Sequence, residues 1–535
     1  MNEDGAGRVA ASRAQPMSAP LSPSPRALAL WRRAERRFDA AFGSACNPLR
    51  QLGALGFLAF WLLAVTGVYL YTGLETSVSG AWESIERLSR EQPYFGGVLR
   101  SMHRYAAGAF VVFTVLHIVR EWLHGHYRGF RRYSWLTGVP LVPLLFASAI
   151  GGFWLQWDQL GQFSAIATAE LLDALPLLGA ALARNFLTDA AVSDRLFSLL
   201  IFVHVGLPVL LVFGLWFHVQ RITRAAVFPP LVLAAGSVAA LVTLSIVAPV
   251  TSHPRADLAS VPVALELDWL LLFVHPLTYA TSPGFVWALT AAVFVALLAL
   301  PFVSRRARAP VAVVDPANCN GCRRCFADCP YAAITMLPHP SGRTGRQLAL
   351  VDADLCAGCG VCAGACPSST PFRSVAELST GIDMPQLAIG ALRRQLLQGI
   401  EAMPTPHPIV VFACRHGADV GTLAAPDVLV LPLICAGQLP PSFVEYALRD
   451  GAAGVVVATC RDGGCEFRLG ARWAAERLAG AREPHLRADV PRERVHLVAA
   501  DAGEHARLEA AVQGMRKCLP QINAPVGPAP KIHHG

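Results

Sequence analysis

Six apolar stretches dominate the first 310 residues of the sequence. They cover residues 53–71, 104–119, 135–153, 196–219, 231–250 and 285–303. Each is close to the roughly 20 residues with which a helix crosses a bilayer. The pattern predicts an all-α transmembrane domain with six spans, surrounded by membrane lipid. No stretch of that length follows residue 305, so soluble domains are expected there.

The composition agrees with a membrane protein. A hydrophobic fraction of 54% with 15% charged residues is too apolar for an ordinary soluble chain of 535 residues. The formal net charge of +8 could suggest nucleic acid, but arginines beside the spans explain the excess, so no nucleic-acid partner is expected. Residues 1–46 are rich in Arg, Ala, Ser and Pro and lack the pattern of a signal peptide. They predict a retained, disordered cytoplasmic arm.

The arginines also predict the orientation of the chain, because positively charged short loops stay in the cytoplasm. They cluster before the first span and after the second, fourth and sixth spans: Arg32, Arg33, Arg36, Arg37, Arg50, Arg128, Arg131, Arg132, Arg221, Arg224, Arg305, Arg306 and Arg308. The sequence therefore predicts a multi-pass protein of the inner membrane, with the N-terminus and all residues after 308 in the cytoplasm.

Four histidines lie in the second and fourth apolar stretches. His103 and His117 are separated by the same fourteen residues as His204 and His218. Fourteen residues turn an α-helix through about 1400°, so both histidines of a helix face the same way, about 21 Å apart. Ionisable side chains are rare inside spanning helices, and haem iron binds histidine readily. A lone histidine would more often be a packing residue, but the matched pairs predict an outer b haem on His103 and His204 and an inner one on His117 and His218.

Residues 47 to about 280 resemble cytochrome b of the quinol-oxidising bc-type complexes. The family spaces glycines fourteen residues apart so that haem edges can approach the helix backbone, and this interval recurs between Gly53 and Gly67 and between Gly138 and Gly152. The resemblance implies that Arg100 meets a haem propionate. Glycines are also common in membrane helices generally, and Arg100 could be an ordinary interface residue. Only two spans follow the four-helix part, where the respiratory family has four.

The resemblance extends, in degenerate form, to the family's outer quinol site. Residues 156–159 stand for a Pro-Trp-Gly-Gln loop and residues 267–270 for a Pro-Glu-Trp-Tyr motif. It implies quinone as substrate and Asp268 as acceptor of a quinol proton. An interfacial acid with no catalytic part is the alternative.

A pair of ferredoxin motifs follows the membrane part. Each has the spacing Cys-x2-Cys-x2-Cys-x3-Cys-Pro, in which the fourth cysteine of each run binds the other cluster. Disulfides are disfavoured in the cytoplasm, and zinc sites normally lack the third cysteine. The sequence predicts an α+β bacterial-ferredoxin-like domain with two [4Fe-4S] clusters, the first on Cys319, Cys322, Cys325 and Cys366 and the second on Cys356, Cys359, Cys362 and Cys329. Residues 341–345 between the runs predict a hairpin turn.

Short β-branched runs alternate with helical stretches towards the C-terminus. Residues 409–412, 428–431, 454–457 and 495–498 predict parallel strands, with helices over 443–448 and 467–478. Cys414, Cys435, Cys460 and Cys465 stand at strand ends, where an α/β fold gathers its ligands. Buried structural cysteine is the alternative.

Residues 409 to about 480 resemble the delta subunit of methyl-viologen-reducing hydrogenase, a hydrogenase iron–sulfur subunit. The resemblance implies a [2Fe-2S] cluster on the four cysteines, although Gly417 replaces the second cysteine of the family's first pair. It also implies that this α/β domain is where a cytoplasmic flavoprotein of the heterodisulfide-reductase type, the expected partner, exchanges electrons with the chain. Cys46 and Cys518 are expected to be free thiols.

The predicted organisation is multidomain. It comprises an arm (1–46), a four-helix haem domain (47–225), two further spans (226–308), a ferredoxin domain (309–375), a linker helix (376–408) and an α/β domain with a parallel sheet (409–535). A homodimer is compatible with this arrangement.

These features together predict a membrane-bound oxidoreductase subunit that passes electrons between the flavin or iron–sulfur partner and the quinone pool. Two alternatives stay open. The chain could be the cytochrome b subunit of a bc-type quinol oxidase complex, with a Rieske protein or cytochrome c as partner. It could also be a redox scaffold or sensor without catalytic activity.

Overall fold

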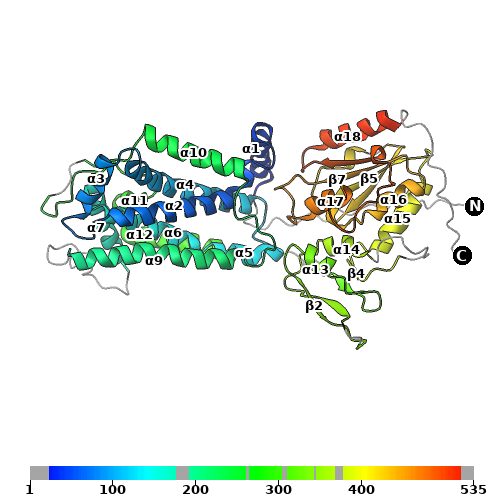
Figure 1. The fold of residues 1–535 in the computed structure, drawn as a ribbon, viewed down its shortest axis with the longest axis horizontal. Coiled ribbons are helices and arrows are strands. Elements are labelled where there is room, and N and C mark those ends of the chain that lie inside the picture. Colours follow the sequence, from blue (N-terminus) through cyan, green and yellow to red (C-terminus); the bar gives the residue numbers. More distant parts are fainter. Residues whose placement is uncertain are drawn as a thin grey trace, which may run out of the picture.

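The computed structural model describes residues 23–175, 192–260, 264–303, 310–342, 345–367, 378–423 and 425–519. Figure 1 shows a long helical part beside a mixed part of helices and strands. The predicted arm at residues 1–22 and the predicted boundaries at 308 and 375 lie outside the described residues.

The helical part contains long apolar helices linked by short amphipathic ones. Its described helices are α1 (Pro25–Phe42), α2 (Leu52–Gly73), α3 (Ala81–Glu91), α4 (Gly96–Leu123), α5 (Arg132–Gly138), α6 (Leu141–Leu155), α7 (Gln159–Asp173), α9 (Asp194–Val219), α10 (Leu231–Val247), α11 (Val274–Ala280) and α12 (Pro283–Val303). Helix α2 packs on α4, and α6 packs on α9. Large apolar side chains such as Val65, Phe202 and Phe213 face outward, as lipid-facing positions do.

Five described segments are long and apolar enough to cross a membrane. They are Leu52–Gly73, Gly96–Leu123, Gly129–Leu155, Asp194–Val219 and Pro283–Val303. The fifth predicted span, 231–250, is shorter than expected, because α10 ends at Val247 after 17 residues. Pro249 explains this end, since the residue before a proline is disfavoured in helical conformation.

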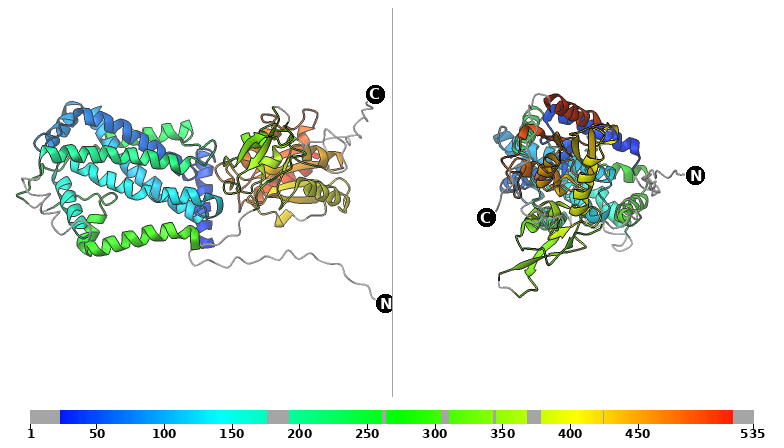
Figure 2. Two further views of the ribbon diagram at one scale, coloured as in Figure 1. Left: turned by 90° about the horizontal axis from the view of Figure 1, so that it is seen from below. Right: turned by 90° about the vertical axis from the view of Figure 1, so that its right-hand side faces the viewer.

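The prediction of a disordered arm up to residue 46 is wrong from Pro25 onward. Ser24 caps α1 by accepting a hydrogen bond from the backbone N–H of Ala27, and Pro25 occupies the first helical position. Glu35 and Asp39 of this helix are buried. Figure 2 (left) shows α1 lying across the end of the helix bundle, next to the mixed part.

Two small antiparallel sheets follow the bundle. Strand β1 (Val313–Val314) pairs with β4 (Ile382–Asp383), and β2 (Ile334–Pro338) pairs with β3 (Gln347–Val351). The register joins Pro338 to Gln347, which confirms the predicted hairpin, although residues 343–344 of its turn lie outside the described residues. The short helices α13 (Arg324–Asp328) and α14 (Val361–Gly364) each contain one cysteine of a motif.

A four-stranded parallel sheet forms the C-terminal part. Its strands are β5 (Ile409–Cys414), β6 (Val428–Leu433), β7 (Gly454–Thr459) and β8 (Val495–Ala499), in the order β6-β5-β7-β8. The helices are α15 (Ile389–Glu401), α16 (Ser442–Arg449), α17 (Gly470–Leu478) and α18 (His505–Cys518). The predicted parallel strands are confirmed.

Alternate residues of β5 pack on opposite faces of this sheet, as the two-residue period of a strand requires. Val410 and Phe412 belong to a core that includes Phe443 of α16, whereas Val411 packs with Met515 of α18. The first of these cores also contains cysteines of both ferredoxin motifs, together with Cys435. The two cysteine-rich regions therefore share one continuous core.

Candidate metal centres

The four membrane histidines form two facing pairs between α4 and α9. The ring centroids of His103 and His204 are 6.5 Å apart, and those of His117 and His218 are 6.4 Å apart. Two imidazoles that bind one metal ion from opposite sides, each through a bond of about 2.1 Å, place their centroids about 6 Å apart. Both pairs therefore have the spacing of a bis-histidine iron site.

Hydrogen bonds orient three of these imidazoles. Nδ1 of His103 lies 2.9 Å from Oγ1 of Thr66, and Nδ1 of His204 lies 3.0 Å from the Ser148 carbonyl oxygen. Nδ1 of His218 lies 3.4 Å from Oγ1 of Thr137. Engagement of Nδ1 leaves Nε2 available for iron.

Each predicted glycine faces one of these histidines. A Cβ atom would come 3.4 Å from the His117 ring at Gly53, 3.1 Å from His103 at Gly67, 2.9 Å from His218 at Gly138 and 3.0 Å from His204 at Gly152. By contrast, a Cβ at the neighbouring Gly151 would meet nothing within 4 Å. The glycine hydrogens thus leave room around each histidine pair, and the residues present fit haem.

Arg100 lies one turn before His103 on α4 and is buried. Its guanidinium donates to Glu86 Oε1 at 3.0 Å, to Ser89 Oγ at 2.8 Å and to Ser252 Oγ at 2.5 Å. Burial raises the pKa of Glu86, but hydrogen bonds from Ser252 and Arg100 outweigh it and hold that pKa below the usual value. Arg100 thus already has an anionic partner, and contact with a propionate stays a prediction.

Asp268 has a mostly buried side chain that forms an ion pair with Arg104. Its Oδ1 also accepts the backbone N–H groups of Leu270 at 3.1 Å and Leu271 at 2.8 Å. These contacts favour the ionised carboxylate, the form that can accept a proton, and they also fix the turn before α11. Its role as a quinol base stays a prediction.

The eight ferredoxin-type cysteines separate into two groups. One hollow, with about 300 Å³ of empty space, is lined by Cys319, Cys322, Cys325 and Cys366. A second, with about 330 Å³, is lined by Cys329, Cys356, Cys359 and Cys362. In each hollow the fourth cysteine of one motif joins three from the other, which is the grouping expected from the motif spacing.

The surroundings of these thiols suit an iron–sulfur cluster. Burial, with the neighbouring Cys322, Cys366 and Cys319, raises the pKa of Cys325 to about 12. The thiolate form at neutral pH therefore needs positive charge nearby, which iron supplies.

The four cysteines of the C-terminal sheet also meet at one edge. Cys414 ends β5, Cys435 follows β6, and Cys460 follows β7, which are adjacent strands. The Sγ atoms of Cys414 and Cys460 are 3.7 Å apart, and Cys465 packs in the same cluster. Gly470 allows the approach of Cys435, because a Cβ there would lie 2.1 Å from its sulfur. Four converging thiols fit a small iron–sulfur cluster.

Membrane loops contact the segments that contain these cysteines. Thr223, five residues after His218, donates to the Cys329 carbonyl oxygen at 2.7 Å. Arg120, three residues after His117, donates to the Gly463 carbonyl oxygen at 3.2 Å. Phe130 contacts the tilted ring of Tyr331 and stacks on Phe467, with centroid distances of 4.8 and 5.8 Å. The inner histidine pair thus lies a few residues from contacts with two cysteine sites.

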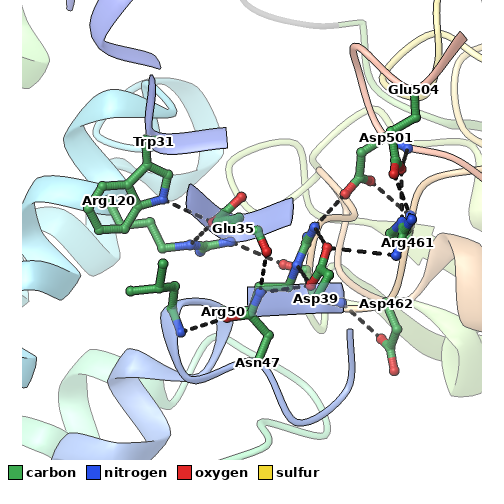
Figure 3. Close-up of polar contacts among 12 residues, drawn as sticks. Trp31, Glu35, Asp39, Asn47, Arg50, Arg120, Arg461, Asp462, Asp501 and Glu504 are labelled. Carbon is green, nitrogen blue, oxygen red and sulfur yellow. Dashed lines mark hydrogen bonds and ion pairs between the residues drawn. The ribbon is translucent and has the colours of Figure 1, made fainter. Parts of the chain in front are cut away.

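A network of charged groups joins α1 to the same region (Figure 3). Arg50 pairs with Asp39 at 2.8 Å and with Asp501 at 2.8 Å, and Arg120 pairs with Glu35 at 2.9 Å. Burial raises the pKa values of Glu35 and Asp39, but the neighbouring arginines, with Asn47 at Asp39, hold both below their usual values. No sequence pattern indicates this network, because its partners are separated by up to 451 residues.

His275 is a further buried group that sequence reasoning missed. It lies on the short helix α11, and its Nε2 is 3.0 Å from Ser164 Oγ. Its Nδ1 has no hydrogen-bond partner among the described residues. Unlike the four paired histidines, it has no second histidine fourteen residues away, so the sequence did not single it out.

Three family models match separate regions of the chain. Cytochrome b/b6/petB matches residues 39–226, the 4Fe-4S dicluster domain matches residues 318–370, and the delta subunit of methyl-viologen-reducing hydrogenase matches residues 409–523. The predicted resemblances are confirmed. The chain combines regions similar to all three families, which supports a multi-pass membrane electron-transfer subunit of oxidoreductase type. The first two matches imply haem b and [4Fe-4S] clusters.

Among solved structures, a chain titled "Hyperthermophilic respiratory Complex III" is similar to this protein. The match covers 47% of this chain and 74% of that chain, with 20% sequence identity and a TM-score of 0.39.

Proposed function

We propose that this chain passes electrons between a cytoplasmic flavin or iron–sulfur partner and the quinone pool. The observation that supports this most directly is the contact between the inner histidine region and two cysteine sites, through Thr223 to Cys329 and through Arg120 to Gly463. Direct contact between the segments that contain the cofactor sites favours electron transfer from one site to the next over separate functions for each site.

The proposed ligands are those that the structure brings together. His103 with His204, and His117 with His218, hold two b haems. The two hollows hold [4Fe-4S] clusters, and Cys414, Cys435, Cys460 and Cys465 hold a [2Fe-2S] cluster. When bound, these groups supply one-electron chemistry. The protein contributes the orienting hydrogen bonds of the histidines and the glycines beside them.

We propose six crossings, with α10 as the fifth. Phe228, just before α10, contacts Phe57 near the start of α2 edge to face, with ring centroids 5.0 Å apart. At its other end, the Ala248 carbonyl oxygen accepts from the Tyr105 hydroxyl at 2.6 Å, near the start of α4. Because α2 and α4 are antiparallel neighbours, α10 runs from one end of the bundle to the other. Six crossings return the chain to the cytoplasm, consistent with the loop arginines and an inner-membrane location.

The delta-like region supports a cytoplasmic flavoprotein or iron–sulfur protein as the soluble partner. A bc-type activity with a Rieske protein or cytochrome c would instead use the outer side alone. In both activities a group on the outer side, such as Asp268, would accept the quinol proton.

A short-chain quinol tests the quinone link. Added anaerobically to purified protein in lipid nanodiscs, it should reduce the haems, and the matching quinone should reoxidise them, as followed by visible absorption. Asp268→Asn should slow quinol-linked haem reduction on the order of 100-fold, because a general base is lost. The amide oxygen of asparagine can still accept the backbone N–H groups of Leu270 and Leu271.

Asp257→Asn is the matched control, because Asp257 accepts the Ala259 N–H in a similar outer turn. It should react at the wild-type rate. If neither quinol nor quinone changes the haem spectrum of the wild-type protein, the proposed function fails. If Asp268→Asn also reacts at the wild-type rate, quinone chemistry belongs beside the inner pair.

A further inference from the structure

The three cysteine sites differ in exposure. Cys322 is exposed, and its site opens at the surface of the molecule. In the second hollow, Cys329, Cys359 and Cys362 are buried, and Cys356 is only partly accessible. The third site is the most enclosed, since the exposed fractions of Cys414, Cys435, Cys460 and Cys465 are 4%, 1%, 1% and 8%.

The third site is covered by the membrane part itself. Arg120 contacts the Gly463 carbonyl oxygen, and Arg131 donates to that of Glu466. Arg468 donates to the Thr223 carbonyl oxygen at 3.1 Å. The loop that contains Cys460 and Cys465 is therefore held against the membrane part, where a soluble protein cannot reach it.

The second hollow lies between the other two. Helix α14, which contains Cys362, packs on residues 436–438, just after Cys435. The contact is so close that a Cβ at Gly364 would lie 2.3 Å from the Gly437 carbonyl oxygen. Helix α14 also packs on α13, which contains Cys325 of the first hollow. Exposure thus falls from the first site to the third, towards the membrane.

The rim of the first site has the chemistry of a protein-docking surface. Arg323 is exposed, Arg324 is partly exposed and pairs with Glu483 at 3.2 Å, and Arg346 donates to the Cys319 carbonyl oxygen at 3.2 Å. Phe326 is 47% exposed. Glu483 offsets the charge of Arg324, so the positive charge of the rim comes from Arg323 and Arg346. Aromatic residues are enriched where proteins bind each other. An acidic partner complements this rim in charge.

We propose that Cys322, Arg323, Arg324, Phe326 and Arg346 form the docking surface for an acidic one-electron carrier protein of flavodoxin or small-ferredoxin type. This inference rests on the proposed function and replaces the α/β domain, expected from the family resemblance, as the contact point of the soluble partner. Each encounter moves one electron, so that the carrier is oxidised by one electron and this chain is reduced by one. Two encounters supply the two electrons that, with two protons, convert a quinone to a quinol.

Binding of a purified acidic flavodoxin to the intact protein in nanodiscs tests the surface. The affinity of the wild-type protein should fall steeply as salt is raised, because exposed charges are screened. Arg323→Glu should weaken binding about tenfold or more at low salt, and Phe326→Ala should weaken it without changing the salt dependence. Lys517→Glu is the charge-matched control, since Lys517 is exposed on α18, at the opposite edge of the soluble part in Figure 1. It should bind like wild type, and all variants should keep the wild-type iron content.

Equal affinity of wild type and both rim variants, or weakening by Lys517→Glu alone, would overturn the docking surface. Absence of any flavodoxin binding by the wild-type protein would overturn it as well. Haem reduction by a short-chain quinol in the same preparations keeps the two proposals apart. If quinol still reduces the haems but flavodoxin does not bind, only the docking surface is refuted. If quinol does not reduce the haems, the proposed function is refuted.

Discussion

At the scale of single residues, the histidine sites depend on neighbouring glycines, whose lack of a Cβ leaves room beside each imidazole. Gly152 and Gly151 are neighbours on α6, yet only Gly152 faces a histidine, since a Cβ there would lie 3.0 Å from His204. The fourteen-residue interval made Gly152 predictable, because a helix repeats its face at that spacing. The hydrogen bond between His204 and the Ser148 carbonyl was not predictable, because every residue has such a carbonyl.

This pair of glycines provides a test with a built-in control. Gly152→Val should displace His204 and remove or distort the outer haem, because two extra methyl groups must fit where one Cβ already crowds the ring. Gly151→Val adds the same volume where nothing lies within 4 Å, so both haems should remain. Haem-to-protein ratios and low-spin electron paramagnetic resonance signals measure the outcome. Equal spectra for the two variants would show that Gly152 does not define a haem site.

At the scale of elements, α1 departs most from the prediction, which placed a disordered arm there. Its sequence is rich in arginine and alanine and gave the pattern of an arm, because the residues that complete its buried face come from far along the chain. Arg120 and Arg461 are such partners, and Arg461 also pairs with Glu504 at 2.6 Å. The helix therefore links the membrane part to the C-terminal sheet by charge rather than by an apolar core.

Removing one cation of this network should loosen α1. Arg50→Ala leaves Asp39 buried without its main partner, which costs about 3 kcal/mol, or roughly 100-fold in the local opening equilibrium. Hydrogen exchange of the α1 amides should accelerate accordingly. Arg37→Ala, at an exposed position of the same helix, should leave exchange unchanged. Equal protection of α1 in both variants would contradict a structural role for the network.

The same network gives α1 a defined pH dependence. Glu35, Asp39 and Glu504 have pKa values below their usual values of 4.5, 3.8 and 4.5, since arginine contacts outweigh burial. Groups with lowered pKa stabilise the folded state above their unfolded pKa and lose that contribution as pH falls through the folded value. Protection of α1 should therefore be constant above about pH 4.5 and decline below it.

At the scale of the whole molecule, sequence predicted the parts better than their arrangement. Histidine spacing, cysteine spacing and β-branched runs are local signals, and the structure contains the corresponding histidine pairs, cysteine groups and parallel strands. The position of the third cysteine site against the membrane loops depends on pairs such as Arg131 with Glu466, which are 335 residues apart. No local pattern records such a contact, so the order of the sites came only from the structure.

In the proposed function, electrons pass between the soluble cysteine sites and the membrane haems. The most direct measurement is the rate of haem reduction by reduced methyl viologen, compared between wild type and Cys359→Ser, with quinol reduction of the haems as proof that both remain intact. We expect haem reduction by viologen to be at least about tenfold slower in the variant, and haem reduction by quinol to be unchanged. Wild-type rates with viologen in a variant that has lost iron from the second hollow would contradict the account.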